Sequence, residues 1–173
     1  MSEIKPIETV YNGYRFRSRL EARWAVFFDA MGIKYEYEPE GFEFGDGTKY
    51  LPDFLLHVLC QNHESVYAEV KGVMSESDLN KIMLFGERHP IIVLGNLPGG
   101  LIEYVELWYK NKLFHSFKFI DGRNSFAPFK ISRLGPIICN YYDIEEQDCE
   151  TMDKALLKAR QARFEHGECG APK

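Results

Sequence analysis

Two short motifs in the stretch 50–72 constrain the fold of this chain more than any other feature. The stretch reads Tyr-Leu-Pro-Asp-Phe-Leu-Leu-His, then a polar break, then Val-Tyr-Ala-Glu-Val-Lys-Gly. The two runs are typical of strands, and the break of about five residues is typical of a hairpin loop. A turn near Gln61 or Asn62 places Asp53 opposite the segment 69–71. The spacing therefore predicts that two carboxylates and an ammonium group meet at one end of a hairpin.

The second run also alternates, which predicts a strand with one apolar and one polar face. Val66, Ala68 and Val70 would lie on the apolar face. Glu69 and Lys71 would stand side by side on the other face, about 7 Å apart. Two neighbouring carboxylates repel each other unless a cation or a proton lies between them. A hard divalent cation such as Mg²⁺ meets this need, and an adjacent lysine suits phosphate or water chemistry.

The composition predicts one folded domain over 1–173. The chain has 173 residues, of which 45% are hydrophobic and 14% aromatic, enough for one well-packed core. No run of about 18 apolar residues occurs, which argues against a transmembrane helix and a membrane partner. The start, Met-Ser-Glu-Ile-Lys-Pro, lacks the apolar core of a signal peptide, so a cytoplasmic protein is expected. The four cysteines, expected to be free thiols because they lack paired spacing, are Cys60, Cys139, Cys149 and Cys169.

The net charge of −5 does not exclude a nucleic-acid partner, because binding depends on local rather than total charge. Four arginines fall within 15–23, where they form either the solvated face of a helix or a set of phosphate contacts. Arg15 and Arg17 precede the predicted helix and are the preferred candidates for phosphate contacts. Lys49, just before the first motif, and Lys81, on the second predicted helix, are further candidates.

Helical periodicity and turn residues predict the elements around the two motifs. The clearest is a helix over 18–31, which begins at a Ser18 cap and ends before Gly32. Its apolar positions recur at helical spacing: Leu20, Trp24, Phe27, Phe28 and Met31. The other elements predicted in this half are an edge strand near 8–11 with an Asn12-Gly13 turn, a strand near 34–38, the two strands of the hairpin, a helix over 75–88 and a buried strand over 91–94.

The second half of the chain has weaker signals. Two strands are predicted over 101–109 and 113–120, joined near Asn111 as a hairpin. Residues 121–150 are rich in turn formers and are expected to be irregular. A final helix is predicted over 151–165, with small and apolar residues on one face and basic residues on the other. The basic face is either a solvated surface or a second phosphate clamp.

Glu21 has two interpretations. Ser18 and Glu21 form a capping-box pattern, in which the glutamate bonds back to the Ser18 amide. In the other interpretation, Glu21 lies on a stripe with Ala25 and Phe28, borders the packed face of the helix, and directs its carboxylate toward the hairpin. Because further acids follow downstream, we favour the second interpretation.

The order of these features resembles the PD-(D/E)xK nuclease superfamily. An acid lies on the first helix, Pro52-Asp53 on the second strand and Glu69-Val70-Lys71 on the third. The segment 16–24 also looks like the opening of small nuclease-like proteins of phages and bacteria. The resemblance covers about 12–95 and implies an α/β (α+β) fold, with a restriction-endonuclease-like αβββαβ core around a mixed central sheet. Residues 96–173 would add a C-terminal β-hairpin and helix.

The resemblance also implies a catalytic site. Asp53 and Glu69 would hold Mg²⁺, or Mn²⁺ as its expected substitute, helped by the backbone carbonyl of Val70. Lys71 would orient the attacking water or stabilise charge in the transition state. Glu21 would complete the site by supporting a second metal ion or by positioning Lys71. The whole signature is present, which argues against a decayed relative that only binds.

The function that follows from this resemblance is that of a metal-dependent endonuclease that hydrolyses phosphodiester bonds. DNA is favoured over RNA as the partner, the setting is a bacterial cell or a phage-infected host, and a homodimer is left open. Two alternatives remain. One is a non-catalytic nucleic-acid-binding protein that keeps the nuclease-like fold, and the other is a protein-interaction module that acts through residues 101–150.

A zinc site is a further alternative. His57, Cys60 and His63 are spaced so that they could supply half of one, with other ligands from the C-terminal part of the chain. Structural zinc sites use tightly paired spacings, whereas these ligands are dispersed. Loop histidines and buried thiols are therefore the preferred interpretation.

Overall fold

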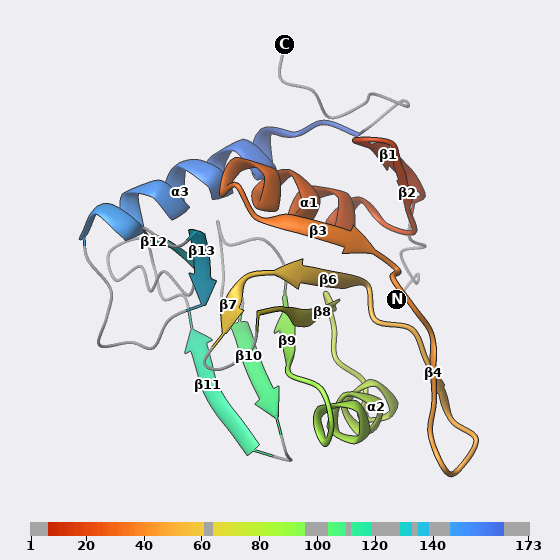
Figure 1. The fold of residues 1–173 in the computed structure, drawn as a ribbon. Coiled ribbons are helices and arrows are strands. Elements are labelled where there is room, and N and C mark those ends of the chain that lie inside the picture. Colours follow the sequence, from red (N-terminus) through yellow and green to blue (C-terminus); the bar gives the residue numbers. More distant parts are fainter. Residues whose placement is uncertain are drawn as a thin grey trace.

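A mixed sheet lies at the centre of the fold (Figure 1). Its strands are β3 (Lys34–Tyr37), β6 (Phe54–His57), β8 (Val66–Val70), β9 (Ile91–Leu94), β10 (Tyr104–Tyr109) and β11 (Lys112–Lys118). Their order across the sheet is β11-β10-β9-β8-β6-β3, with β8 and β9 parallel and the other neighbours antiparallel. The computed structural model describes residues 7–60, 64–95, 104–109, 112–118, 129–132, 135–138 and 146–164, and side chains over 7–58, 64–95 and 150–164.

The register of β6 against β8 confirms the predicted antiparallel pairing of these two strands, whereas the predicted turn near Gln61 or Asn62 lies outside the described residues. Phe54 lies opposite Ala68, and Leu56 lies opposite Val66. One step further along the same register, Asp53 falls opposite Glu69. The two motifs therefore meet at one end of this strand pair.

Three helices in the described part of the chain cover the two faces of the sheet. They are α1 (Arg19–Ala30), α2 (Glu76–Gly86) and α3 (Glu146–Gln161). Figure 1 shows α1 and α3 side by side on one face and α2 on the other. None of these helices is long and apolar enough to cross a lipid bilayer. The α/β (α+β) architecture with a mixed central sheet is confirmed, and it is compatible with a restriction-endonuclease-like core.

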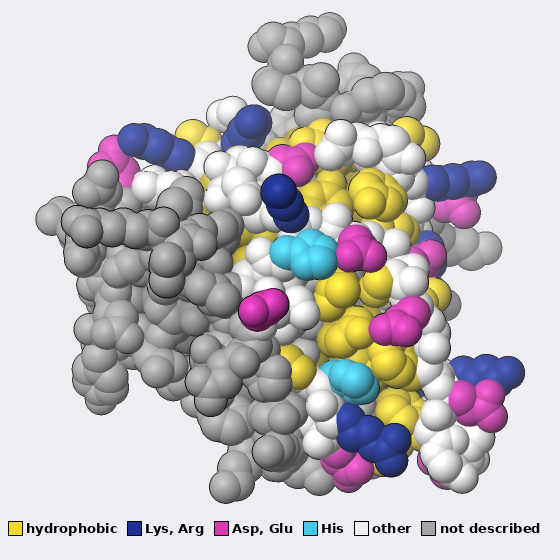
Figure 2. Space-filling view, in the orientation of Figure 1, with side chains coloured by type: hydrophobic (Ala, Val, Ile, Leu, Met, Phe, Trp, Pro, Cys, Tyr) yellow, Lys and Arg dark blue, Asp and Glu magenta, His cyan; other side chains and the backbone are white. Residues whose placement is uncertain are grey.

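Charged side chains of both signs are exposed on the molecular surface. On the described part of the face in Figure 2, acidic and basic side chains are interspersed with apolar ones. This face therefore carries no extended basic surface among the described residues.

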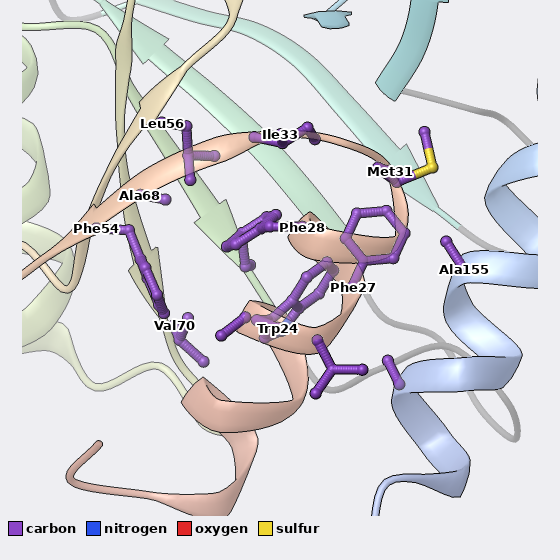
Figure 3. Packing of buried hydrophobic residues seen from close by; sticks show 14 of the residues in the cluster. Trp24, Phe27, Phe28, Met31, Ile33, Phe54, Leu56, Ala68, Val70 and Ala155 are labelled. Carbon is purple, nitrogen blue, oxygen red and sulfur yellow. The ribbon is translucent and has the colours of Figure 1, made fainter. Parts of the chain in front are cut away.

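The main core lies between the sheet and α1 (Figure 3). Helix α1 begins at Ser18, whose hydroxyl accepts a hydrogen bond from the Glu21 N–H, and it ends before Gly32 at φ +68°. Its buried aromatic residues pack on side chains of β6 and β8, while α3 covers the outer side of α1. The predicted helix over 18–31 is confirmed. The residues shown in Figure 3 include Trp24, Phe27, Phe28, Met31, Ile33, Phe54, Leu56, Ala68, Val70 and Ala155.

The alternation of β8 and β9 divides the apolar side chains between two cores. Ala68 and Ile92 face α1, whereas Val93 faces the smaller core beneath α2. In that smaller core, Phe85 of α2 packs against Tyr50 with ring centroids 5.1 Å apart. Both faces of these central strands are therefore buried, as the apolar run over 91–94 predicts.

Short hairpins flank the core elements. β1 (Thr9–Tyr11) and β2 (Tyr14–Phe16) are joined by the predicted turn, with φ +47° at Asn12 and +82° at Gly13. β4 (Phe42–Glu43) pairs with β5 (Lys49–Tyr50). The helix predicted over 75–88 is observed as α2, with Ser75 as its N-cap.

The expectation of irregular structure over 121–150 was wrong in two places. The structure contains β12 (Phe129–Ser132) and β13 (Gly135–Ile138), and β13 pairs in parallel with β7 (Leu59–Cys60). This pairing joins segments far apart in sequence, so local periodicity does not report it. Helix α3 also begins earlier than predicted, because acidic residues that resemble a turn are favourable at a helix N-terminus.

The later elements continue the central assembly. β10 and β11 form the predicted hairpin and extend the sheet beyond β9, and α3 packs against α1. The division of the single domain 1–173 into a core over 12–95 and an addition over 96–173 stays a prediction.

Phe28 gives a test of this packing. It is fully buried, and its ring lies 5.4 Å from that of Phe54. We expect Phe28→Ala to lower the free energy of unfolding by about 3–5 kcal/mol, because it leaves a cavity between α1 and the sheet. Urea unfolding measures this loss. Leu157→Ala, at an α3 position that is 51% exposed, is the control and should change stability by about 0.5 kcal/mol or less. Equal losses in the two variants would contradict this packing.

Candidate active site

Asp53 lies directly before β6 and is only 4% exposed. Its Oδ2 accepts a hydrogen bond of 2.7 Å from the Val70 backbone N–H. Its Oδ1 accepts a charged hydrogen bond of 2.6 Å from the Arg17 guanidinium. Arg17 also pairs with Glu38 at 2.7 Å. The carboxylate is therefore held between β8 and the segment that precedes α1.

Glu69 and Lys71 lie together at the end of β8. Glu69 is 4% exposed; its Oε2 accepts a hydrogen bond of 2.7 Å from the Tyr50 hydroxyl, and its Oε1 lies 3.0 Å from Lys71 Nζ. This contact confirms that the two side chains share one face of the strand. Lys71 Nζ also lies 3.3 Å from Asp78 Oδ1 of α2.

Glu21 supports the helix start, as the first interpretation expects, but through the Ser18 hydroxyl and not the Ser18 amide, and it also lies near Asp53, as the second interpretation expects. It lies in the first turn of α1, where its Oε1 accepts a hydrogen bond of 2.6 Å from the Ser18 hydroxyl. Its Oε2 accepts bonds from the Tyr37 hydroxyl at 2.6 Å and from the Arg17 backbone N–H at 3.2 Å. The side chain therefore supports the start of the helix. It is also 7% exposed and close enough to Asp53 to affect the pKa of that residue.

The three carboxylates interact electrostatically. Burial raises the pKa of Asp53, and the nearby negative charges of Glu69 and Glu21 raise it further, to about 8. The Val70 N–H and the Arg17 guanidinium partly oppose this rise. The Asp53 carboxylate is therefore only partly compensated by the guanidinium and the N–H group beside it.

The Val70 carbonyl points toward the same acids. The Lys71 backbone N–H donates to the Leu94 carbonyl of β9 at 2.9 Å. In a trans peptide the C=O points opposite to the N–H, so the Val70 carbonyl points away from β9 and toward the Asp53 side of β8. This is the orientation that the predicted role of Val70 requires.

A cavity of about 160 Å³ opens beside Glu69 and Lys71. Three of the four predicted phosphate-binding residues, Arg17, Lys49 and Lys81, line it. The fourth, Arg15, is not among the lining residues; its largely exposed side chain pairs with Glu8. The full set of lining residues is Arg17, Lys49, Tyr50, Leu51, Glu69, Lys71, Asp78 and Lys81.

The chemistry of this site suits a hard divalent cation. Among the described residues, no group of three or more His, Cys, Asp and Glu side chains is arranged as a metal-binding cluster. Arg17 and Lys71 instead contact the carboxylates directly. The donors at this point are buried carboxylate oxygens and a backbone carbonyl, which are the ligand types that Mg²⁺ takes. The negative charges of Glu69 and Glu21 favour a cation beside Asp53.

The proposed zinc ligands receive no support. His57 Nε2 lies 2.9 Å from Glu36 Oε1, so this ring nitrogen already has a carboxylate partner. The side chains of Cys60 and His63 lie outside the described residues, as do those of Cys139, Cys149 and Cys169. The expectation of a loop histidine was wrong for His57, which is the last residue of β6 and is exposed.

Sequence reasoning missed three residues that contact the predicted site. They are Tyr37, Tyr50 and Asp78, which contact Glu21, Glu69 and Lys71 respectively. Asp78 had a local signal, because Ser75 and Asp78 have the spacing of a capping box. The tyrosines had none, since hydroxyl contacts across a sheet depend on tertiary packing.

Comparison with known proteins gives two relatives. Over 78 residues the chain is 33% identical to Endonuclease I of Escherichia phage T7, covering 43% of this chain and 48% of the relative. Over 82 residues it is 34% identical to Endodeoxyribonuclease 1 of Enterobacteria phage T3, covering 45% of this chain and 49% of the relative. The chain is similar to phage endonucleases.

This similarity supports the predicted relationship to nucleases but covers only part of each protein. The chain spans about half the length of the curated relatives that it matches. No family model matches the sequence, and no solved structure matches it either. Membership of the PD-(D/E)xK superfamily therefore stays a prediction.

The raised pKa of Asp53 predicts a pH-dependent stability in the absence of divalent ions. The unfolded chain releases this proton near pH 3.9 and the folded chain near pH 8, so the folded state holds the extra proton between these values. Asp53 should therefore make the free energy of unfolding fall as pH rises from about 4 to about 8. Asp53→Asn should remove this contribution.

Urea unfolding at pH 5, 7 and 9 in the presence of a chelator tests this prediction. The stability of Asp53→Asn should decline less over this range than that of the wild type. Asp153→Asn changes an exposed aspartate on α3 and should follow the wild type. Parallel curves for Asp53→Asn and the wild type would show that Asp53 does not hold its proton in the folded state.

Proposed function

We propose that the chain is a metal-dependent endonuclease that hydrolyses phosphodiester bonds in DNA. The observation that carries this proposal is the burial of Asp53 and Glu69 at one end of the β6–β8 pair, with Glu69 beside Lys71 in a cavity whose rim is basic. The relatives' names supply the reaction class, and one of them specifies DNA. Carboxylates, an ammonium group and basic side chains are the groups that phosphodiester hydrolysis requires.

Four groups would hold the cation. They are the carboxylates of Asp53 and Glu69, the backbone carbonyl of Val70 and the carboxylate of Glu21. Glu21 would act either in the outer coordination sphere of this ion or as a ligand of a second metal ion. A bound Mg²⁺ supplies Lewis acidity and lowers the pKa of a coordinated water. The burial of these acids favours a metal ion here, because water excluded from the site would not screen the charges around the reacting phosphate.

Lys71 acts as a cation in this proposal. Burial lowers its pKa, but the carboxylates of Glu69 and Asp78 raise it by more, so the net pKa lies above its ordinary value. An ammonium group cannot accept a proton from water. Lys71 would therefore donate hydrogen bonds to the phosphate or to the attacking water and stabilise negative charge in the transition state.

Arg17, Lys49 and Lys81 would bind the DNA backbone. They line the cavity from three different segments of the chain, so together they can contact more than one phosphate. Contacts of this kind fix the position of the duplex without reading its sequence. Arg17 has a second partner in Asp53, and its half-exposed side chain can exchange that carboxylate for a phosphate.

Cleavage of DNA tests the proposed activity. Purified protein with Mg²⁺ should cut linear, plasmid or branched DNA, and Asp53→Asn, Glu69→Gln and Lys71→Met should each lose at least about 10²-fold in kcat. Asp153→Asn and Lys158→Met, which change exposed residues on α3, are matched controls and should stay near wild type. Wild-type protein that binds DNA but does not cut it would favour the non-catalytic alternative.

Metal binding is tested separately from cleavage. A cation that binds only the folded state raises its stability. Mn²⁺ or Mg²⁺ should therefore raise the melting temperature of the wild type in the absence of DNA. The increase should be lost in the double variant Asp53→Asn/Glu69→Gln and retained in Asp153→Asn. An equal increase in all three proteins would place the bound metal elsewhere.

A further inference from the structure

Lys71 has a second carboxylate partner that does not belong to the sequence motif. Its Nζ lies 3.0 Å from Glu69 Oε1 and 3.3 Å from Asp78 Oδ1. Glu69 lies on β8, which Lys71 directly follows, whereas Asp78 lies in the first turn of α2. The ammonium group is therefore held between two elements of the fold.

The two oxygens of Asp78 have different partners. Oδ2 accepts hydrogen bonds from the Ser75 hydroxyl at 2.6 Å and from the Ser75 N–H at 3.2 Å, while the Ser75 hydroxyl accepts one from the Asp78 N–H at 3.1 Å. This reciprocal pattern is a capping box. Oδ1 contacts Lys71. The cap therefore fixes the carboxylate in place independently of Lys71.

This arrangement differs from an ordinary surface ion pair. Exposed pairs are weak because two long side chains must be ordered in water. Here the Lys71 and Asp78 side chains are 29% and 27% exposed, and the cap already orders one partner. An ammonium group has three N–H donors, and the two carboxylates take two of them. Within the part of the chain that the structure describes, these carboxylates are the side-chain partners of Lys71, so the remaining donor can serve a ligand in the cavity that both residues line.

We propose that Asp78 is a positioning residue, which holds Lys71 through the capping box of α2 so that one N–H of its ammonium group is directed to the bound phosphate. This inference rests on the proposed nuclease function. It extends the functional site to α2 and makes the start of that helix a part of the catalytic geometry. Asp78 itself does not touch the reacting atoms.

Two variants separate positioning from helix capping. Asp78→Asn keeps an oxygen that can cap Ser75, but it loses the charge that attracts Lys71. Ser75→Ala keeps the Asp78 carboxylate and removes the cap hydroxyl. We expect Asp78→Asn to lower kcat by about 10–100-fold with KM for DNA nearly unchanged, because misplacing a catalytic group is costly. Ser75→Ala should instead act mainly on stability, lowering the melting temperature by about 2–4 °C, and should lower kcat by less than Asp78→Asn does, because the Asp78 carboxylate and the Ser75 N–H are both retained. Glu76→Gln, at an exposed position in the same turn of α2, is the matched control and should leave kcat within about twofold of wild type.

A second measurement needs neither DNA nor metal. The melting-temperature changes of Asp78→Asn and Lys71→Met should be non-additive in the double variant, because each removes the same contact. Those of Ser75→Ala and Lys71→Met should be closer to additive. Unchanged kcat in Asp78→Asn, or additive effects of Asp78→Asn and Lys71→Met, would overturn the proposed role. If the wild type cuts no DNA, the proposed function fails, while non-additivity would still show that Asp78 anchors Lys71.

Discussion

The mutual repulsion of three buried carboxylates, Glu21, Asp53 and Glu69, is the interaction on which the site depends. A charge removed from water requires compensating partners, and each of these acids has them. Arg17 and the Val70 N–H contact Asp53, whereas tyrosine hydroxyls contact the two glutamates. These contacts still leave the pKa of Asp53 well above its ordinary value. The fold therefore maintains an acidic cluster that a divalent cation would relieve.

The topology of the sheet explains why these groups meet. Asp53 precedes β6 and Glu69 lies near the end of β8, and the antiparallel register of these strands brings the two positions together. Glu21 lies in the first turn of α1, and Asp78 lies in the first turn of α2. The positive ends of two helix dipoles are thus associated with the site, where they favour carboxylates and phosphates. The four acidic residues of the site therefore come from the first turns of two helices and from positions at the ends of two strands.

Features encoded by local pattern could be predicted from the sequence, whereas long-range partners could not. The alternation after Val66 and the hairpin spacing were sufficient to place Glu69 beside Lys71 and opposite Asp53. Nothing local indicates that β13 pairs with β7 or that Tyr50 reaches Glu69, because both contacts depend on how distant segments pack. Arg15 and Arg17 are equivalent by sequence position, yet only Arg17 lies at the acids. The sequence therefore indicated which basic segment lies near the site, but it did not distinguish Arg17, which lines the cavity, from Arg15, which does not.

The two cations at the acids are held in different ways, which suggests different tasks. Lys71 follows a central strand and is tied to both Glu69 and the capped start of α2, so its ammonium group has little freedom to leave. Arg17 lies in the segment before α1 and lines the cavity, and its side chain, which pairs with Glu38 and Asp53, is 53% exposed. A cation at Asp53 would compete with the guanidinium for the same oxygen. In the proposed function, Arg17 would exchange Asp53 for a DNA phosphate, while Lys71 would stay paired with Glu69 and Asp78.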